Sequence, residues 1–263
     1  MEIQIKKAVR AGNSSAVILP RAWLNKEIRV ELVKKSNEMI LIDVIEILNK
    51  YINLEDIIGI YLTGSYARGE EEQKSDIDIL VITDDIDREM ISDGIYNVFV
   101  ISSELLKQKL KSDILPVGQM IKEAKALINS GYLESIEIKA TKENVKWYIN
   151  TTEDKLKIIK KAINNYRKKN KKHISDLVAY TMILRIRTLY IIKNLIKNKI
   201  YSKKEFIRLI RKISGSMNAY NGYLAVKNDE EDKYRTEIGE AERLYNYLKK
   251  KLMDIKAIKF DAN

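Results

Sequence analysis

Two apolar segments of strand length flank a short polar stretch in the first third of the chain, and this arrangement restricts the possible folds more than any other part of the sequence. The first segment runs from Ile57 to Thr63 and stops at Gly64-Ser65, and the second, Ile77 to Ile82, begins next to Asp76. Apolar runs of this length predict strands that are buried within a sheet. A glycine allows the chain to turn sharply, and a serine often begins a helix. The pattern therefore predicts strand, turn, short helix and strand, with polar side chains gathered at one edge of the sheet.

The two aspartates of this stretch have the spacing of a metal site. Asp76 and Asp78 are two residues apart on the second strand, so their side chains share one face. Carboxylates held that close repel each other unless a cation lies between them, and Mg²⁺ (or Mn²⁺) suits such ligands and shares its shell with substrate phosphates. The Ser65 hydroxyl and the free N–H groups at the start of a helix can bind triphosphate oxygens. These residues predict a site for a nucleoside triphosphate (NTP) and a divalent metal, with Asp76 and Asp78 as catalytic and metal-binding residues.

Neither half of the motif is specific alone, because Asp-x-Asp is common at solvated strand edges and Gly-Ser is an ordinary turn. Together they resemble the Gly-Ser…Asp-x-Asp signature of the DNA polymerase beta superfamily, and most of all its minimal nucleotidyltransferases, over residues 46 to 135. The matched positions are Gly64, Ser65, Ala67, Arg68, Gly69, Glu70, Ser75, Asp76 and Asp78. The resemblance implies that Gly64 and Ser65 hold the NTP and that the aspartates bind the metal. Arg68 either contacts phosphate or braces the helix.

One position departs from that family. Active members usually carry a third carboxylate on a later strand, and the matching strand, Ile95 to Ile101, offers Asn97 or Phe99 there, depending on the register. Asn97 can offer its carbonyl oxygen to a metal, but an amide cannot act as a general base. Asp84 and Asp93 are near in sequence, and we expect both in loops. The site can therefore be active with substrate or water as the base, or it can have lost catalysis.

The hydrophobic period changes twice along the chain and divides it into three domains. Residues 1–45 alternate like short strands, residues 46–140 alternate between strands and helices, and residues 141–263 repeat at helical spacing. The expected fold class is α+β or α/β, with a small N-terminal β swapped hairpin, a central mixed sheet and a C-terminal all-α bundle.

The individual elements follow from the same periods. The expected strands are Glu2 to Ile5, Ala16 to Leu19, Ile28 to Leu32, Ile57 to Thr63, Ile77 to Ile82 and Ile95 to Ile101, with a turn at Gly12-Asn13. The expected helices are Val44 to Tyr51, Ser103 to Leu110, Val117 to Ile128, Leu177 to Ile196, Glu205 to Ile213 and Ala241 to Leu252. Asp84 to Glu89 is expected to be an acidic loop.

Residues 1–45 resemble the swapped-hairpin DNA-binding domains of the AbrB/SpoVT type. A basic strand, a Gly12-Asn13-Ser14 turn, an apolar strand and Pro20 before a short helix carry the resemblance, although Asn25-Lys26-Glu27 replaces the usual Gly-rich turn. The resemblance implies a homodimer, because a hairpin this small cannot bury its apolar face alone. The candidate DNA-binding residues are Lys7, Arg10, Asn13 and Arg21. The alternative is a dimerisation module with incidental charge.

The C-terminal block resembles the helical domains that accompany nucleotidyltransferases, including HEPN-like bundles. HEPN ribonucleases use an Arg and a His four to six residues apart, and Arg167 and His173 have that spacing. A basic loop between two helices is the commoner explanation for such a lysine-rich run, and we favour it. We expect Arg185 and Arg187 to pair with acidic neighbours, with the nucleotide cleft as the alternative. The tyrosines of the block are expected to pack within the bundle.

Composition limits the remaining possibilities. The formal net charge of +11 favours a polyanionic partner such as nucleic acid, although a lysine-rich solvated surface explains it equally well. The lack of cysteine and the single histidine exclude disulfides and a multi-histidine metal site within one chain. No apolar run approaches the ~20 residues of a membrane span, and the first residues lack the apolar core of a signal peptide. We therefore expect a cytoplasmic protein without a membrane partner; abundant Ile, Lys and Glu point to a thermophilic, archaeal-like source.

These observations support one leading hypothesis and two rivals. The leading one is a Mg²⁺-dependent nucleotidyltransferase that transfers a nucleoside monophosphate from an NTP to an acceptor hydroxyl and is tethered to a DNA-binding, homodimeric module. The first rival is a DNA-binding transcriptional regulator or antitoxin-like protein whose nucleotidyltransferase fold senses nucleotides without turnover. The second is a protein whose basic bundle binds RNA and that modifies RNA ends. The sequence names neither the acceptor nor the nucleobase.

Overall fold

The computed structural model describes residues 3–6, 8–31, 34–73, 75–258 and 260. The chain divides into two compact units, Met1–Asp43 and Val44–Asn263. Lys7, one of the residues expected to contact DNA, lies outside the described residues.

The N-terminal unit contains a short antiparallel hairpin. Strands β1 (Val9–Ala11) and β2 (Ser14–Ala16) pair across the expected turn at Gly12-Asn13, where Gly12 has a φ of +62°. A 3₁₀ turn, η1 (Arg21–Trp23), follows Pro20, and helix α1 (Asn37–Leu48) begins near the end of the unit.

The prediction of longer strands in this unit is wrong for the structure of the single chain. Ala16 is the last residue of β2. The other described residues of Glu2 to Ile5, Ala16 to Leu19 and Ile28 to Leu32 lie outside any strand. The physical reason is a lack of burial, because Ile3, Ile18 and Val30 are 82%, 72% and 68% exposed. A two-stranded hairpin offers no apolar layer against which such side chains could pack.

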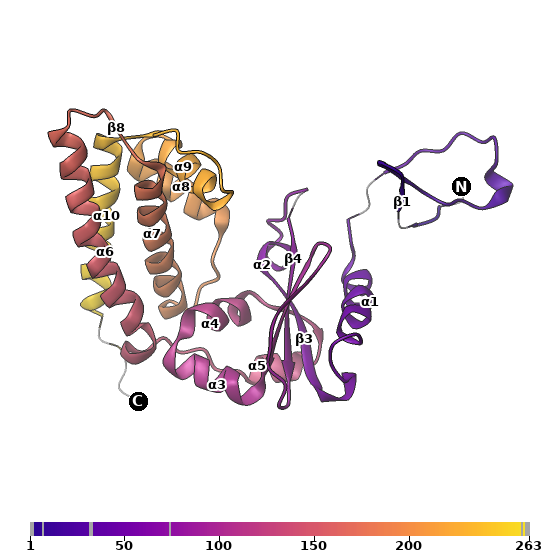
Figure 1. Cartoon of the computed structure of the whole chain (residues 1–263). Coiled ribbons are helices and arrows are strands. Elements are labelled where there is room, and N and C mark those ends of the chain that lie inside the picture. The colour runs from indigo at the N-terminus through magenta and orange to yellow at the C-terminus, as the bar shows by residue number, and fades with distance from the viewer. Residues whose placement is uncertain (1–2, 7, 32–33, 74, 259, 261–263) are drawn as a thin grey trace. The chain divides into compact units, whose positions relative to one another are not determined.

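The second unit is built on a five-stranded mixed sheet with the order β5-β6-β4-β3-β7 (Figure 1). A 3₁₀ turn, η2 (Leu54–Asp56), leads into the sheet. The strands are β3 (Ile57–Thr63), β4 (Ile77–Thr83), β5 (Arg88–Asp93), β6 (Tyr96–Ser102) and β7 (Lys125–Ile128). Strand β4 pairs antiparallel with β3 and parallel with β6, and β5 and β7 add antiparallel edges. The expected mixed-sheet fold class is confirmed.

Both edge strands correct the sequence expectations. Strand β5 occupies Arg88–Asp93, so the acidic loop is shorter than expected and Asp93 ends a strand rather than lying in a loop. The helix expected to reach Ile128 ends at Glu123, because Ala124 is extended (φ −61°, ψ 141°) and the next four residues pair with β3 as β7. Pairing with an open sheet edge outweighs the helical period there, as tertiary contacts often outweigh propensity.

Besides the end of α1, this sheet domain contains the helices α2 (Gly64–Arg68), α3 (Ser103–Ser112), α4 (Ile114–Glu123) and α5 (Ser130–Ser135). A buried cluster joins α3 and α4 to the sheet through Tyr61, Leu80, Ile82, Ile101, Leu106, Val117 and Ile121. Ile79 and Val81, which have the opposite parity on β4, are also fully buried. Burial of both parities explains why the central strands are continuous apolar runs.

The C-terminal part is a helical bundle, as expected (Figure 1). Its helices are α6 (Lys142–Lys168), α7 (Asp176–Ile196), α8 (Lys203–Ser214), α9 (Asn218–Lys227) and α10 (Ile238–Lys256), with a small ladder of β8 (His173–Ile174) and β9 (Thr236–Glu237). Arg167 lies in the last turn of α6 and pairs with Glu242, and His173 begins β8. Among the residues that the structure describes, no helix is both long and apolar enough to cross a membrane.

Candidate active site

The register of the sheet brings the motif residues to one edge. On β4, Asp78 lies opposite Thr63 of β3 and beside Asn97 of β6. The Thr63 hydroxyl donates to the backbone carbonyl of Asp78 at 3.1 Å, which fastens the end of β3 to this point of β4. Gly64 follows Thr63 immediately, so the turn and the aspartate pair meet at the same edge.

Gly64 is the residue that allows the turn and the carboxylate to approach each other. Its φ is +65°, a left-handed conformation that side chains with a Cβ rarely adopt. A Cβ placed on Gly64 would overlap the Asp78 carboxyl group, with the Asp78 Cγ only 2.9 Å away. Helix α2 then begins at once and ends after one turn at Gly69, which is also left-handed (φ +66°). The local sequence thus holds the Asp78 carboxylate directly against the turn.

A second acid, Glu123 of α4, lies behind the turn. Its carboxylate accepts the N–H of Gly64 at 2.9 Å and an Arg68 Nη1–H at 2.6 Å. This corrects the expectation that the first N–H of α2 is free for phosphate, because that donor is already used. Burial raises the pKa of Glu123, and Arg68 opposes the shift. Glu123 lies 59 positions from Gly64 in the sequence, and only its acidity within an apolar helix could have drawn attention to it.

Arg68 connects the turn to the helical bundle. Besides Glu123, its guanidinium binds Glu70 at 3.0 Å, and its side chain is only 11% exposed. Of the two roles considered for Arg68, this is the bracing arrangement. Glu70 in turn accepts the Ser202 hydroxyl at 2.7 Å and the Lys203 N–H at 2.9 Å, both at the start of α8. A continuous set of hydrogen bonds therefore runs from Gly64 to α8.

The pKa of Asp78 reflects the charged and polar groups around it. Its pKa is raised, first by burial and also by the nearby Asp76 carboxylate. Hydrogen bonding from Asn97 and the positive charges of Arg68 and Lys227 act in the opposite direction. Asp76 itself is exposed just before β4. Lys227, the last residue of α9, is a cation near the aspartates that sequence reasoning did not single out.

Asn97 occupies the position where a third carboxylate was sought, and the register selects it over Phe99. Its amide hydrogen-bonds to the Asp78 carboxylate, while its Oδ1 accepts the Ser92 hydroxyl at 3.1 Å. In this orientation the Asn97 amide group donates to Asp78 and its oxygen accepts from Ser92, so the side chain links the end of β4 to β5.

Comparisons with known proteins concern the part of the chain that contains these residues. Residues 43–144 match the family model described as Polymerase beta, Nucleotidyltransferase. This stretch is a polymerase beta nucleotidyltransferase domain. No curated protein matches the chain.

The solved structures that match the chain have low sequence identity to it. A nucleotidyltransferase-like protein from Exiguobacterium sibiricum 255-15 is 13% identical with a TM-score of 0.37, over 80% of this chain and 73% of that one. Spectinomycin adenyltransferase AAD(9) from Enterococcus faecialis, solved with ATP and spectinomycin, is 16% identical with a TM-score of 0.42, over 81% and 98%. A toxin-antitoxin solved with AMP-PNP is 21% identical with a TM-score of 0.25, over 45% and 94%.

The nucleotidyltransferase domain offers a metal two carboxylates. Among the described residues, no group of three or more His, Cys, Asp or Glu side chains is placed to hold a metal. Mg²⁺ is usually bound through one or two carboxylates and completes its shell with water and substrate phosphates. The donor set of Asp76 and Asp78 fits that kind of ion and does not fit a metal that needs a full cage of protein ligands.

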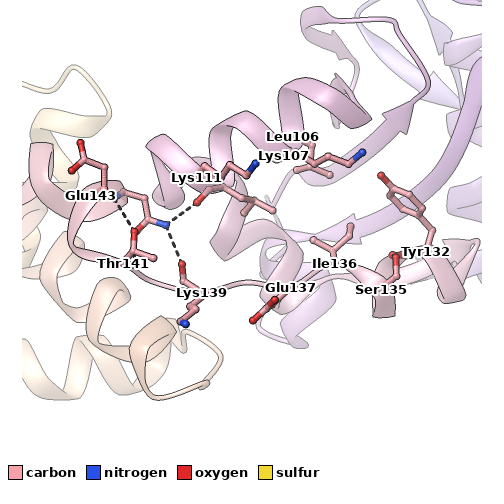
Figure 2. A pocket seen from close by; sticks show the side chains of 12 residues that line it. Leu106, Lys107, Lys111, Tyr132, Ser135, Ile136, Glu137, Lys139, Thr141 and Glu143 are labelled. Carbon is pink, nitrogen blue, oxygen red and sulfur yellow. Dashed lines mark hydrogen bonds between the residues drawn. The ribbon is translucent and has the colours of Figure 1, made fainter. Parts of the chain in front are cut away.

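A cavity of about 610 Å³ in the same domain lies apart from these residues (Figure 2). It is lined by α3, α5 and the segment leading to α6, and none of the motif residues lines it. Asn144 forms part of its wall, donating to the backbone carbonyls of Leu110 and Lys139. The aspartate pair is therefore an open edge and not part of this cavity.

The bundle arginines differ from the sequence expectation of acidic partners. Arg185 donates to Thr151 and lies over the Trp147 ring, 6.0 Å from its centroid. Arg187 hydrogen-bonds to the hydroxyls of Tyr201 and Tyr223, and its Nε is buried without a hydrogen-bond partner. The correction has a simple cause, because the partners of these two arginines are Thr151 and aromatic side chains rather than acids.

The other predicted site residues lie in the N-terminal unit. Arg10 is on β1 and donates to the Gly12 carbonyl at 3.3 Å, Asn13 is in the turn, and Arg21 begins η1. All three side chains are exposed. They form part of a unit separate from the nucleotidyltransferase domain.

Proposed function

We propose that the chain is a Mg²⁺-dependent nucleotidyltransferase that transfers the nucleoside monophosphate group of an NTP to an acceptor hydroxyl. The observation that carries this proposal is the contact between the left-handed Gly64 and the Asp78 carboxylate, at a turn where only glycine fits. Asp76 lies close enough to affect the ionisation of Asp78. The family match over residues 43–144 supports the same class of reaction.

Each residue of the site has a defined task in this proposal. Asp76 and Asp78 hold Mg²⁺ (or Mn²⁺), which when bound would neutralise phosphate charge and polarise the α-phosphate. Ser65, partly exposed in the first turn of α2, binds phosphate through its hydroxyl and its N–H, and Gly64 lets the phosphate approach the backbone. Lys227 supplies a further positive charge that faces Asp78.

The proposed transfer requires no reactant other than the NTP, the acceptor and water. The acceptor oxygen forms a bond to the α-phosphorus, the bond from that phosphorus to the β-phosphate oxygen breaks, and pyrophosphate leaves. The proton of the acceptor hydroxyl passes to water or to a substrate oxygen, since Asn97 cannot accept it. Positioning and electrostatics then account for most of the rate, as is usual for phosphoryl chemistry.

The test is Mg²⁺-dependent NTP binding measured by calorimetry. Asp76→Ala/Asp78→Ala should abolish the Mg²⁺-dependent part. Asp84→Ala/Asp85→Ala, which removes two exposed carboxylates from the bend after β4, should leave it unchanged. Equal binding by the wild type and Asp76→Ala/Asp78→Ala would sink the proposal.

We infer that the N-terminal unit is a DNA-binding module that joins two copies of the chain. Exposed Arg10, Asn13 and Arg21 around one small hairpin support DNA contact. Ile18 and Leu24 are each 72% exposed, and a second copy would cover such apolar side chains. Sedimentation of the full chain and binding to duplex DNA test the two parts of this inference separately.

Asn97 favours a second candidate function. With an amide beside Asp78, the fold can bind nucleotide and sense it without turnover, as a transcriptional regulator or antitoxin-like protein would. Incubation with labelled NTP distinguishes the two candidates. Robust incorporation of label into protein or nucleic acid rules out a purely sensory role, whereas nucleotide binding without incorporation favours it.

A further inference from the structure

The exposed side of α8 carries a row of four cations, Lys204, Arg208, Arg211 and Lys212. Spacings of three and four residues place them on neighbouring positions of one helix face. On the opposite face, Phe206 and Ile210 are 1% and 0% exposed within the bundle core. The helix is therefore fixed by its apolar side and presents this row of cations, called the α8 row below, to solvent.

Within the described part of the chain, none of the four side chains of the α8 row takes part in an ion pair or a side-chain hydrogen bond. The one acid of the helix, Glu205, accepts the Tyr190 hydroxyl at 3.2 Å.

Other bundle helices carry both paired and unpaired exposed cations. Lys157, Lys251 and Lys256 pair with Asp154, Asp254 and Glu153, whereas Lys161, Lys249 and Lys250 take part in no ion pair among the described residues. The α8 row differs because its four cations lie on one face of a single helix and none of them is paired. The row therefore concentrates positive charge.

The α8 row begins beside Glu70, which is joined to the turn that carries the motif. The backbone N–H groups of Lys203 and Lys204 donate to Glu70 at 2.9 and 3.3 Å, and Glu70 is joined through Arg68 and Glu123 to Gly64. From Lys204 to Lys212 the helix extends about 12 Å, at 1.5 Å per residue. A ligand that binds along the row would thus have one end next to the turn that carries the motif.

A second group of lysines continues the positive charge beside α8. Glu205 and Leu209 of α8 line a cavity of about 340 Å³ together with Lys193, Lys197, Lys199 and Lys251 of neighbouring elements and with Asp254, which pairs with Lys251. Burial and the nearby charges of Lys251 and Lys197 lower the pKa of Lys193, and Asp254 opposes this shift. The four lysines outnumber the two acids of the lining, so the concavity keeps an excess of positive charge that an anionic ligand stabilises.

We propose that the α8 row and the lysine-lined cavity beside it bind the phosphates of a nucleic-acid strand, which is the acceptor. This rests on the proposed nucleotidyl transfer, with the terminal hydroxyl of the strand as the attacking group. Four cations along one helix face match the repeated phosphates of a strand, whereas a small acceptor would need only one or two. Binding along the row releases counterions from the strand, so the affinity depends steeply on salt.

The experiment measures fluorescence anisotropy of labelled single-stranded RNA and DNA 12-mers with the full-length protein across a range of salt concentrations. The test variant is Lys204→Gln/Arg208→Gln/Arg211→Gln/Lys212→Gln. The matched control is Lys161→Gln/Lys168→Gln/Lys169→Gln/Lys171→Gln, which removes four exposed lysines from the end of α6 and the turn after it. Glutamine retains good helix propensity, and circular dichroism verifies the fold of both variants.

The expected results separate the α8 row from net charge. At about 0.7 per phosphate contact, the slope of log K against log salt should fall by about 3 in the test variant, with at least tenfold weaker binding at low salt. The control should keep most of the slope. Equal losses in the two variants, or no loss in either, overturn the proposal. Equally strong competition by poly-glutamate also overturns it, since the partner would then be an acidic protein.

Parallel titration with Mg²⁺ and NTP distinguishes this proposal from the proposed function. The α8 row contains no residue of the nucleotide site, so the test variant should bind NTP like the wild type. If the wild type binds no NTP but its strand binding depends on the α8 row, the proposed transfer fails and the binding surface stands. If NTP binds normally and strand binding ignores the α8 row, this inference alone fails.

Discussion

Glu70→Gln removes the charge at the junction between the motif and the bundle while keeping the shape of the side chain. Glu70 is 8% exposed and accepts hydrogen bonds from the Ser202 hydroxyl (2.7 Å), the Lys203 N–H (2.9 Å) and Arg68 Nε (3.0 Å). Glutamine has one carbonyl oxygen, and its NH₂ group would face donors where the second carboxylate oxygen now accepts. The substitution therefore leaves donors of α8 or Arg68 unsatisfied.

The magnitude follows from the pKa of Glu70. Burial on its own would raise that pKa, but the hydrogen bonds from Ser202, Lys203 and Arg68 outweigh burial and lower it from 4.5 to about 2. At 1.36 kcal/mol per unit, the charged form contributes about 3 kcal/mol to folding. Because the folded pKa is depressed, this contribution is fully present above pH ~4.5 and is lost as the pH falls toward 2. About 1.4 kcal/mol should remain at pH 3.

The assay is urea unfolding followed by tryptophan fluorescence at pH 7 and at pH 3. Glu70→Gln should lower the free energy of unfolding by about 3 kcal/mol at pH 7 and by roughly half of that at pH 3. The control is Glu72→Gln, which removes a 72% exposed partner of Lys203 and should cost less than about 0.5 kcal/mol. A Glu70→Gln loss below about 1 kcal/mol at pH 7, or a loss that does not shrink at pH 3, would refute the reasoning.

Three further changes test other contacts. Gly64→Ala should lower the free energy of unfolding by at least about 2 kcal/mol and abolish NTP binding, because the new Cβ overlaps Asp78. Gly69→Ala is the control, since Gly69 has a φ of +66° but no atom within 4 Å of the new Cβ; it should cost only about 1 kcal/mol and still bind NTP. Equal effects of the two variants in calorimetry and urea titration would contradict this. Asp176→Asn should lower the free energy of unfolding by about 2–4 kcal/mol, because this fully buried carboxylate accepts two backbone N–H groups and a guanidinium, and an unchanged urea midpoint would count against that account. Ile18→Glu should convert the proposed dimer to monomer in sedimentation, and an unaltered mass would exclude this surface from the dimer contact.

The central part of the sheet domain could be predicted from the sequence because its signals are local. The apolar runs of β3 and β4 and the Gly64-Ser65 turn all lie within residues 57–83, so the strand-turn-helix-strand order follows directly. The edge strands β5 and β7 could not be predicted in this way. They are short, and β7 is strand only because the open edge of β3 is there to pair with it.

The contacts that shape the site were beyond sequence reasoning for a different reason. Gly64 meets Glu123, which is 59 positions away, and Glu70 meets Ser202, which is 132 positions away. Nothing in the sequence around Gly64 or Glu70 specifies a partner so far away in the chain. The register also had to be seen before Asn97 could be distinguished from Phe99, because a shift of two residues along β6 leaves the apolar pattern almost unchanged.

The hydrogen bonds from Gly64 to α8 divide the motif into two kinds of residues. Arg68 and Glu70 hold the bundle against the sheet domain, whereas Ser65, Asp76 and Asp78 face the open edge. In a chain that had stopped transferring nucleotides, the first group would still stabilise the fold. The presence of Arg68-Gly69-Glu70 in a sequence of this kind therefore indicates the fold, and only the Ser65 hydroxyl and the Asp76 and Asp78 carboxylates indicate catalysis.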